Sequence, residues 1–292
     1  MHRIGNEQRA GIDRAVTEAL ALAPGTAAGS KGGSSRPRRL LVTSLNVRDG
    51  VVGDGHASID PGNYAIARLG AESGAWTAFF SDDPLMLASE NLAEFDAVCF
   101  NNTVGVLTDD SVLQQSLLDY VRSGGGFVGL HAAAATFCQY PRYDQFPDYG
   151  RMIGGFENGG HPWKENETIV LTPEDADSPI NASFGGRDFE IQDEVFQMKD
   201  HYSRDRLRVL LRINEAKTDF SPDRNILAER RADSDIAISW IRSEGQGRVF
   251  YSSLGHNAHI FANPPVLAHF LAGIRYALGD LDADATPRAK PA

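Results

Sequence analysis

The chain has 292 residues, of which 42% are hydrophobic and 23% are charged, and its formal net charge is −11 at pH 7. A chain of this length and composition can form a globular protein with a substantial core. The negative charge argues against a nucleic-acid binder, because phosphate binding needs a basic surface, and no apolar run approaches the roughly 18 residues of a membrane span.

The cysteines and the N-terminal composition indicate a reducing compartment. Cys99 and Cys138 form no C-x-x-C pair, which argues against a thiolate zinc site and against a disulfide framework. Acidic residues interrupt the apolar ones between residues 6 and 22, so no secretory signal is predicted there. We therefore expect a cytoplasmic protein.

The N-terminal region predicts a short helix followed by a linker. Apolar residues recur at helical intervals from Ile12 to Leu22, and residues 24–37 (PGTAAGSKGGSSRP) are rich in glycine and serine. We expect an extension at residues 1–37, a folded domain at residues 38–280 and a flexible tail at residues 281–292.

The first half of the domain alternates strands and helices. Strands are predicted at residues 39–45, 76–80, 95–100 and 127–130, and helices at residues 62–73 and 109–122. This alternation is typical of an α/β fold with a doubly wound, mostly parallel sheet.

The second half predicts further strands and a last helix. The strand candidates are residues 167–171, 189–198, 206–213, 236–242 and 247–252. We expect them to form an antiparallel extension of the sheet. The helix at residues 264–278 is expected to pack on one sheet face, and a homodimer could form through it or through an edge strand.

The most informative stretch is residues 124–137, GGGFVGLHAAAATF. It predicts a buried strand that turns sharply into a helix, with His131 at the corner. Ligands of open α/β sheets bind beyond the carboxyl ends of the strands. We therefore interpret His131 as a functional residue rather than as a histidine of the core.

Other polar side chains are expected near the same edge of the sheet. They follow predicted strands or lie in the loops beyond them, where one cleft would collect them: His56, Asn101, His131, His161, Asp193, Glu194 and His256. Asp193 and Glu194 are adjacent on a predicted strand and point to opposite faces, so only one reaches a given cleft easily. His269 is expected to be structural, and the sequence assigns no role to His201.

Three kinds of chemistry fit these residues. Histidines and a carboxylate can hold a divalent metal such as zinc, and they can also act without metal as a general base and its partner. Alternatively they only bind a sugar, with Trp163, Tyr149 and Phe156 as stacking surfaces. No H-E-x-x-H spacing is present to favour the metal.

A serine or cysteine hydrolase is a further alternative. Its elbow needs a nucleophile at the corner, as in G-x-S-x-G, but this chain has G-L-H-A-A there. An amidotransferase-like hydrolase that uses Cys138 is less favoured, because this residue follows the elbow by several positions and is expected to be buried.

Four separated motifs resemble the ThuA-like, or trehalose-utilisation, family. They are residues 124–133 (GGGFVGLHAA), 159–163 (GGHPW), 189–194 (FEIQDE) and 247–256 (GRVFYSSLGH), and the resemblance covers residues 38–278. It implies a flavodoxin-like fold of the class I glutamine amidotransferase type without the catalytic cysteine. It also implies a role in carbohydrate metabolism, beside oxidoreductases that produce keto-sugars.

The resemblance assigns matching positions to individual residues. His131 matches the histidine of the family's G-hydrophobic-H-A motif, His161 that of G-H-P, and His256 that of the later G-H motif. Asp193 and Glu194 match a D-E pair. His56 corresponds to a histidine after the first strand, although the loop before it is longer than in the family.

These observations together predict an enzyme that acts on a sugar or keto-glycoside by elimination or hydrolysis. His131, Glu194, Asp193 and His256 are the predicted catalytic residues, and His131, His256 and Glu194 are the predicted metal ligands. Substrate-binding roles are expected for His56, Asn101, His161 and Trp163. A small carbohydrate is the expected partner, and a non-catalytic sugar-binding protein is the alternative.

Overall fold

The structure is a computed structural model that describes residues 4–23, 25, 38–139, 142, 144–157, 166–220 and 233–291. Its α-helices are α1 (Asn6–Leu22), α2 (Ile59–Ser73), α3 (Ser89–Leu92), α4 (Ser111–Arg122), α5 (Pro147–Ile153) and α6 (Pro264–Ala277). Its strands are β1 (Arg38–Thr43), β2 (Asn46–Arg48), β3 (Val51–Val52), β4 (Trp76–Phe80), β5 (Ala97–Asn101), β6 (Val104–Gly105), β7 (Gly126–Leu130), β8 (Thr168–Pro173), β9 (Phe189–Gln192), β10 (Arg208–Ile213), β11 (Ala237–Glu244) and β12 (Gly247–Ser252).

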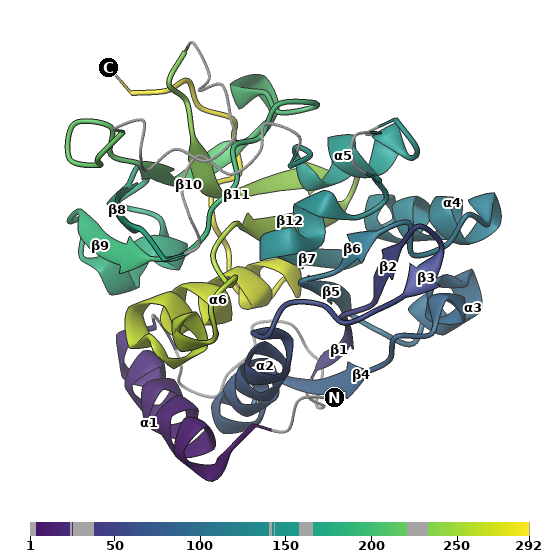
Figure 1. Cartoon of the computed structure of the whole chain (residues 1–292), viewed down its shortest axis with the longest axis horizontal. Helices are drawn as coiled ribbons and strands as arrows, with labels where there is room; N and C mark the ends of the chain where they lie inside the picture. Colours follow the sequence, from purple (N-terminus) through teal and green to yellow (C-terminus); the bar gives the residue numbers. More distant parts are fainter. Residues whose placement is uncertain are drawn as a thin grey trace.

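A nine-stranded sheet runs through the molecule in the order β4-β1-β5-β7-β12-β11-β10-β8-β9 (Figure 1). The strands from β4 to β12 pair in parallel, and the remaining strands continue the sheet in antiparallel pairs. The predicted doubly wound, mostly parallel sheet with an antiparallel extension is confirmed. β7 and β12 are neighbours in its middle, so the polar loops that follow them lie next to each other.

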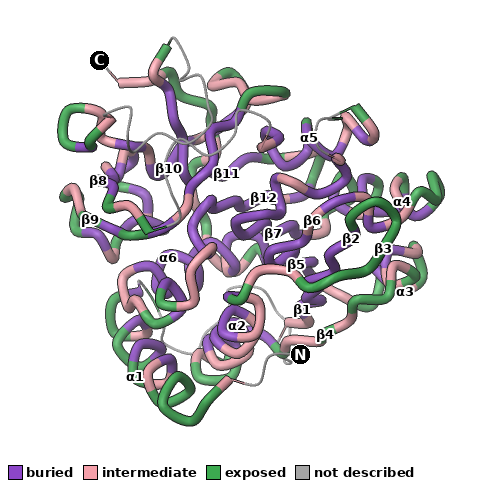
Figure 2. The backbone as a smooth tube through the Cα atoms, viewed as in Figure 1, coloured by how far each residue is buried: buried purple, intermediate pink, exposed green. Residues whose placement is uncertain are grey.

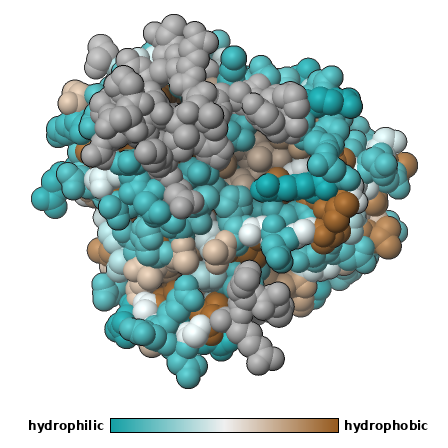
Figure 3. Space-filling model, in the orientation of Figure 1, coloured by the Kyte–Doolittle hydropathy of each residue, from teal (hydrophilic) through white to brown (hydrophobic). Residues whose placement is uncertain are grey.

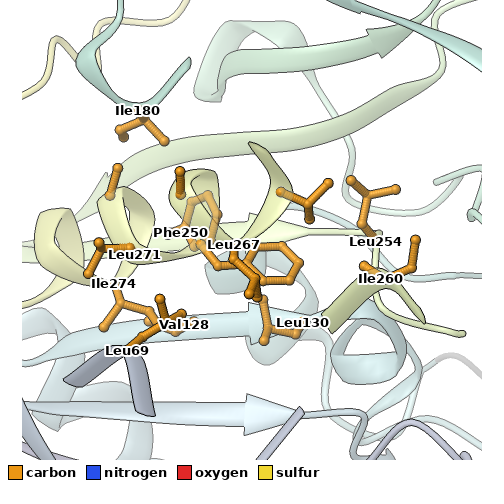
Figure 4. Close-up of a cluster of buried hydrophobic side chains, with 14 of the residues drawn as sticks. Leu69, Val128, Leu130, Ile180, Phe250, Leu254, Ile260, Leu267, Leu271 and Ile274 are labelled. Carbon is orange, nitrogen blue, oxygen red and sulfur yellow. The ribbon is translucent and has the colours of Figure 1, made fainter. Parts of the chain in front are cut away.

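Helices cover both faces of the sheet and enclose two hydrophobic cores. Helices α1, α2 and α6 lie on one side, while α3, α4 and α5 lie on the other (Figure 1). The close-up of the first core shows Leu267, Leu271 and Ile274 of α6 over Val128 and Phe250 of the sheet (Figure 4). The buried backbone follows the central strands and α6, and exposed segments lie mainly in outer loops and helix faces (Figure 2).

Helix α1 packs against the folded domain. Ile12, Val16 and Ala19 are fully buried in the same core as α2 and α6. At the surface, Asp13 accepts hydrogen bonds from the Tyr64 hydroxyl (3.0 Å) and from Nε of Arg68 (2.9 Å), and both donors belong to α2. The amphipathic helix predicted at residues 6–22 is therefore present. The linker predicted at residues 24–37 lies outside the described residues except for Gly25.

A small second sheet, in the order β3-β2-β6, lies above the carboxyl ends of β1 and β5 and was predicted only as a loop. Val51 and Val52 on its hairpin are 66% and 69% exposed. A hydrophobic patch is visible over this β2–β3 hairpin (Figure 3). The hairpin lengthens the path to His56, which explains why the loop before that residue is long.

The structure departs from the prediction in three further places. The alanines after His131 form a 3-10 turn (His131–Ala135) instead of an α-helix. Helix α5 lies between the elbow and β8, where the sequence analysis predicted no helix. Strand β9 ends at Gln192, so it is shorter than the strand expected at residues 189–198. Residues 193–198 form no strand.

The residues after α6 run along the strands of the antiparallel half. Asp284 pairs with Arg208 of β10 (3.3 Å) and Asp282 pairs with Arg248 of β12 (3.3 Å). Lys290 pairs with Glu215 (3.0 Å). In the part of the chain that the structure describes, no helix combines the length and the apolar character needed to cross a membrane.

Replacing Ile12 tests whether α1 stabilises the domain. Ile12→Ala removes a fully buried side chain between α1 and the core, and we expect the free energy of unfolding to fall by about 2–5 kcal/mol. Glu18→Ala, at an exposed position of the same helix, is the control and should change it little. Thermal or denaturant unfolding measures the stability of the two variants. Equal stability would show that the packing of α1 does not stabilise the domain.

Candidate active site

The elbow after β7 positions His131 at the centre of the candidate site. Its backbone has a φ of +46°, a left-handed conformation that costs a non-glycine residue roughly 1–2 kcal/mol. Nδ1 of the ring lies 2.8 Å from the carbonyl oxygen of Ser253, and the Tyr251 hydroxyl donates to the His131 carbonyl (2.8 Å). The ring also stacks on Phe196 with 4.3 Å between ring centroids. These contacts offset the backbone cost and fix the orientation of the imidazole.

The hydrogen bond to Ser253 decides which nitrogen of His131 faces the site. A carbonyl oxygen only accepts, so the proton lies on Nδ1 and Nε2 keeps its lone pair. Burial lowers the pKa of His131 well below its usual value of 6.5, and the neighbouring His56 and His256 lower it further. His131 therefore presents a neutral nitrogen, as metal ligation or general-base chemistry requires.

Four side chains converge on this nitrogen and are called the His/Glu group below: His56, His131, Glu194 and His256. Nε2 of His131 lies 3.2 Å from Nδ1 of His256 and 3.7 Å from Oε1 of Glu194, and the last two atoms are 3.2 Å apart. The ring of His56 lies with its centroid 5.0 Å from those of His131 and His256. One ligand atom from each residue lies within 4.8 Å of all the others.

The donor atoms of this group suit a divalent metal ion. Zinc binds imidazole nitrogen and carboxylate oxygen atoms at about 2.0–2.2 Å, so two ligands of one tetrahedral ion lie roughly 3.3–3.6 Å apart. The separations of 3.2, 3.2 and 3.7 Å among Nε2 of His131, Nδ1 of His256 and Oε1 of Glu194 are close to that spacing. The proton on Nδ1 of His131 is held by a backbone carbonyl, which is the second hydrogen bond that metal-binding histidines usually make.

Asp193 lies outside the His/Glu group and holds one of its loops. It is fully buried, and its carboxylate accepts hydrogen bonds from the backbone N–H groups of Gly255 (2.7 Å) and Asn257 (2.9 Å) and from the Asn257 side chain (3.1 Å). Burial raises the pKa of Asp193 to about 7, although these donors act in the opposite direction. Of the two adjacent acids, Glu194 thus faces the histidines and Asp193 fixes the backbone on both sides of His256.

The loops that carry His56 and His256 are tied together at Gly255. Its φ of +125° is a conformation that residues with a side chain rarely adopt. Its carbonyl oxygen accepts hydrogen bonds from the Ser58 hydroxyl (2.7 Å) and from the side-chain amide of Asn102 (3.2 Å). Ser58 and Asn102 are functional supports that the sequence analysis did not single out. The Asn-Asn-Thr run at the end of β5 was the only signal for Asn102.

Asn101 supports the site from beneath. It is fully buried, and its side-chain amide donates to Oδ1 of Asn63 (2.9 Å) and to the carbonyl of Ile59 (3.3 Å). Its own Oδ1 accepts a hydrogen bond from Asn102 (3.1 Å). These bonds join the end of β5 to the start of α2. The side chain of Asn101 therefore forms its hydrogen bonds with other residues of the protein.

Two predicted substrate-binding residues, His161 and Trp163, lie outside the described residues. One of the three interpretations of the sequence took Tyr149 and Phe156 as stacking surfaces for a sugar, and their burial contradicts that part of it. Both are fully buried in the core on the α5 side of the sheet, and the Tyr149 hydroxyl donates to the Ala133 carbonyl (2.8 Å). They support the elbow from behind.

Three other histidines of the described residues, His201, His259 and His269, lie outside the His/Glu group, as does Cys138. His269 is fully buried in α6 with Nε2 2.9 Å from the Ser239 hydroxyl, as expected for a structural residue. Nε2 of His259 lies 2.8 Å from the Gln192 carbonyl, and His201 packs against Phe156. Burial raises the pKa of the Cys138 thiol to about 12, which disfavours the thiolate that an amidotransferase-like hydrolase would need.

Comparison with known families supports the motif resemblance. A family model described as ThuA, trehalose utilisation, matches residues 46–277. This span includes the whole His/Glu group and every strand from β2 onward. No curated protein matches the chain by sequence.

Solved structures of low sequence identity share the fold. A ThuA-like protein from Bacteroides uniformis ATCC 8492 is 16% identical with a TM-score of 0.65, over 85% of this chain and 95% of that one. Another from Parabacteroides merdae ATCC 43184 is 16% identical with a TM-score of 0.55, over 83% and 90%. A cytoplasmic protein from Salmonella typhimurium LT2 is 12% identical with a TM-score of 0.50, over 82% and 99%.

Replacing Asp193 tests its role in holding the loop. In Asp193→Asn the amide nitrogen cannot accept a hydrogen bond, so one buried N–H group loses its partner. We expect a loss of about 1–3 kcal/mol in the free energy of unfolding at pH 5. Glu190→Gln, at an exposed position of β9, is the control.

The pH dependence of that loss has a defined sign. The folded pKa of Asp193, about 7, lies above its ordinary value of 3.8, so the stability that its protonated form contributes is present below pH 3.8 and is lost as the pH rises through about 7. Asparagine does not titrate. The difference in the free energy of unfolding between the natural chain and the variant should therefore become smaller from pH 5 to pH 8. A difference that widens over this range would contradict the raised pKa.

Proposed function

Because the chain belongs to the ThuA, or trehalose-utilisation, family, we propose that it is an enzyme that cleaves a keto-glycoside with the help of a divalent metal. The strongest support is the His/Glu group, whose four ligand atoms lie within 4.8 Å of one another around a neutral, backbone-held His131. We propose the cytoplasm as its compartment, and a homodimer remains a prediction.

The residues divide into ligands and a base. Catalytic zinc sites commonly use three protein ligands and leave one position open for water or substrate. We assign the three ligand positions to His56, His131 and His256, and the metal would polarise the carbonyl oxygen of the substrate. Glu194 would then be left free of the metal, with its Oε1 atom 3.2 Å from Nδ1 of His256, where it can take up a proton.

A keto group makes the required proton transfer feasible. The carbonyl acidifies the neighbouring C–H bond, and Oε1 of Glu194 takes that proton. The electron pair of the C–H bond forms a carbon–carbon double bond while the bond to the glycosidic oxygen at the next carbon breaks. Glu194 returns the proton to the departing oxygen, so atoms and charges balance in an elimination. Asp193 contributes by holding His256 in place.

A non-catalytic sugar-binding protein is the second candidate. The same group could orient a sugar through hydrogen bonds without any reaction, and the partial exposure of Glu194 and His256, 13% and 17% of their side chains, allows a ligand to reach them. Product detection after incubation with keto derivatives of trehalose and of alkyl glucosides distinguishes the two. A metal-loaded protein that binds these sugars and releases no product would be a binder.

Removal of His131 should abolish metal binding and turnover. We expect His131→Ala to lower the affinity for zinc by more than about 100-fold, because both a ligand and its hydrogen bond to Ser253 are lost. The measurements are metal content after dialysis, keto-glycoside turnover and circular dichroism for the fold. His259→Ala is the matched control, since this histidine lies outside the His/Glu group. Retained metal and activity in a folded His131→Ala protein would overturn the proposal.

Glu194→Gln separates a base from a ligand. If Glu194 is the base, metal content is retained and turnover falls by about 10²–10⁴-fold. A variant that loses its metal as well would return Glu194 to the ligand set, and a variant with unchanged turnover would exclude it from proton transfer. The same metal analysis and product assay measure both quantities.

A further inference from the structure

A cavity of about 630 Å³ lies directly beside the His/Glu group. Its walls come from the loop at residues 53–57, the start of α2, the ends of β1 and β4, and the beginning of α1. His56 lines the cavity and also belongs to the His/Glu group. The cavity and the proposed reaction centre therefore share one wall.

We infer that this cavity binds the second ring of a non-phosphorylated disaccharide, the part beyond the bond that is cleaved. The inference rests on the proposed function, because it takes the first ring to lie at the His/Glu group. A volume of this size is within the range of about 300–1,000 Å³ that is usual for small-molecule sites.

The polar lining offers partners for sugar hydroxyl groups. The lining includes hydroxyl, amide and carboxylate side chains, namely Ser44, Asn63, Ser81, Asp54, Asp60 and Asp82. The Oδ2 atom of Asp60 is buried and has no hydrogen-bond partner among the described residues. A buried carboxylate oxygen without a partner is costly, so a rotation of the Asp60 side chain that brings this oxygen to a ligand hydroxyl group would relieve that cost.

The charge of the lining selects a neutral ligand. The lining contains three acidic residues, Asp54, Asp60 and Asp82, and one basic residue, Arg9. This excess of negative charge repels a phosphate group but accepts hydrogen bonds from hydroxyl groups. The cavity therefore favours a free sugar over a sugar phosphate.

Helix α1 completes the cavity and orients an aromatic wall. The Arg9 guanidinium lies 5.5 Å from the centroid of the Tyr64 ring, and Asp13 accepts a hydrogen bond from the Tyr64 hydroxyl (3.0 Å). Tyr64 and Phe80 line the cavity, and aromatic rings provide apolar faces for the C–H faces of a sugar. Residues of the N-terminal extension thus contribute to recognition of the second ring.

Binding of unreactive sugars to the full chain tests this inference without requiring turnover. The probes are trehalose, methyl α-glucoside and trehalose 6-phosphate, measured by calorimetry or ligand-observed NMR. We expect trehalose to bind more tightly than the other two. Asp60→Ala and Arg9→Ala should weaken trehalose binding by about 10-fold each and leave methyl α-glucoside binding unchanged.

Arg14→Ala is the matched control, because Arg14 lies on an exposed face of the same helix and does not line the cavity. Circular dichroism shows whether each variant is folded. Equal affinity for one-ring and two-ring sugars, tighter binding of the phosphorylated sugar, or trehalose binding that is unaffected in both variants would each overturn the inference.

The outcome is distinguishable from failure of the proposed function. If the cavity variants weaken trehalose binding but no keto-glycoside is cleaved, the second-ring site stands and the enzymatic proposal fails. If keto-glycosides are cleaved but the cavity variants bind trehalose like the natural chain, the enzymatic proposal stands and this inference fails.

Discussion

The hydrogen bond from Nδ1 of His131 to the Ser253 carbonyl joins the ends of two central parallel strands, and the geometry of the candidate site depends on it. β7 and β12 pair with Leu130 opposite Ser252, so the next residue of each strand lies at the same edge of the sheet. The bond sets the tautomer of His131 and the direction of its free nitrogen, while burial keeps the ring neutral. A one-residue slip between these strands would point the imidazole to the other face.

The two adjacent acids show how one strand end serves two purposes. Glu194 faces the histidines, while Asp193 holds the backbone of Gly255 and Asn257 on either side of His256. Successive side chains of an extended segment point in opposite directions, so a single extended segment delivers both. The buried Asp193 has a pKa near 7. Its hydrogen bonds to the loop around His256 are therefore expected to change as the pH passes through 7.

The sequence predicted the fold class, the family and the location of His131, because these follow from hydrophobic alternation and from motifs that are local in the chain. It left open which of Asp193 and Glu194 faces the site, since this depends on β9 ending at Gln192. It predicted an α-helix after His131 from the propensity of alanine, but the left-handed backbone at that residue starts a 3-10 turn instead. The cavity was not predictable, because its walls come from α1, α2, the loop at residues 53–57 and the ends of β1 and β4, which meet only in the folded chain.

The distances along the chain between the members of the His/Glu group carry one more consequence. His131 and His256 lie 125 residues apart in sequence, and Glu194 comes from the antiparallel half of the sheet. Contacts this far apart form only after long loops have closed, which is the slow part of acquiring an α/β topology. Incorporation of an ion by these side chains would therefore be a late event in maturation, and its uptake would report that both halves of the polypeptide have assembled.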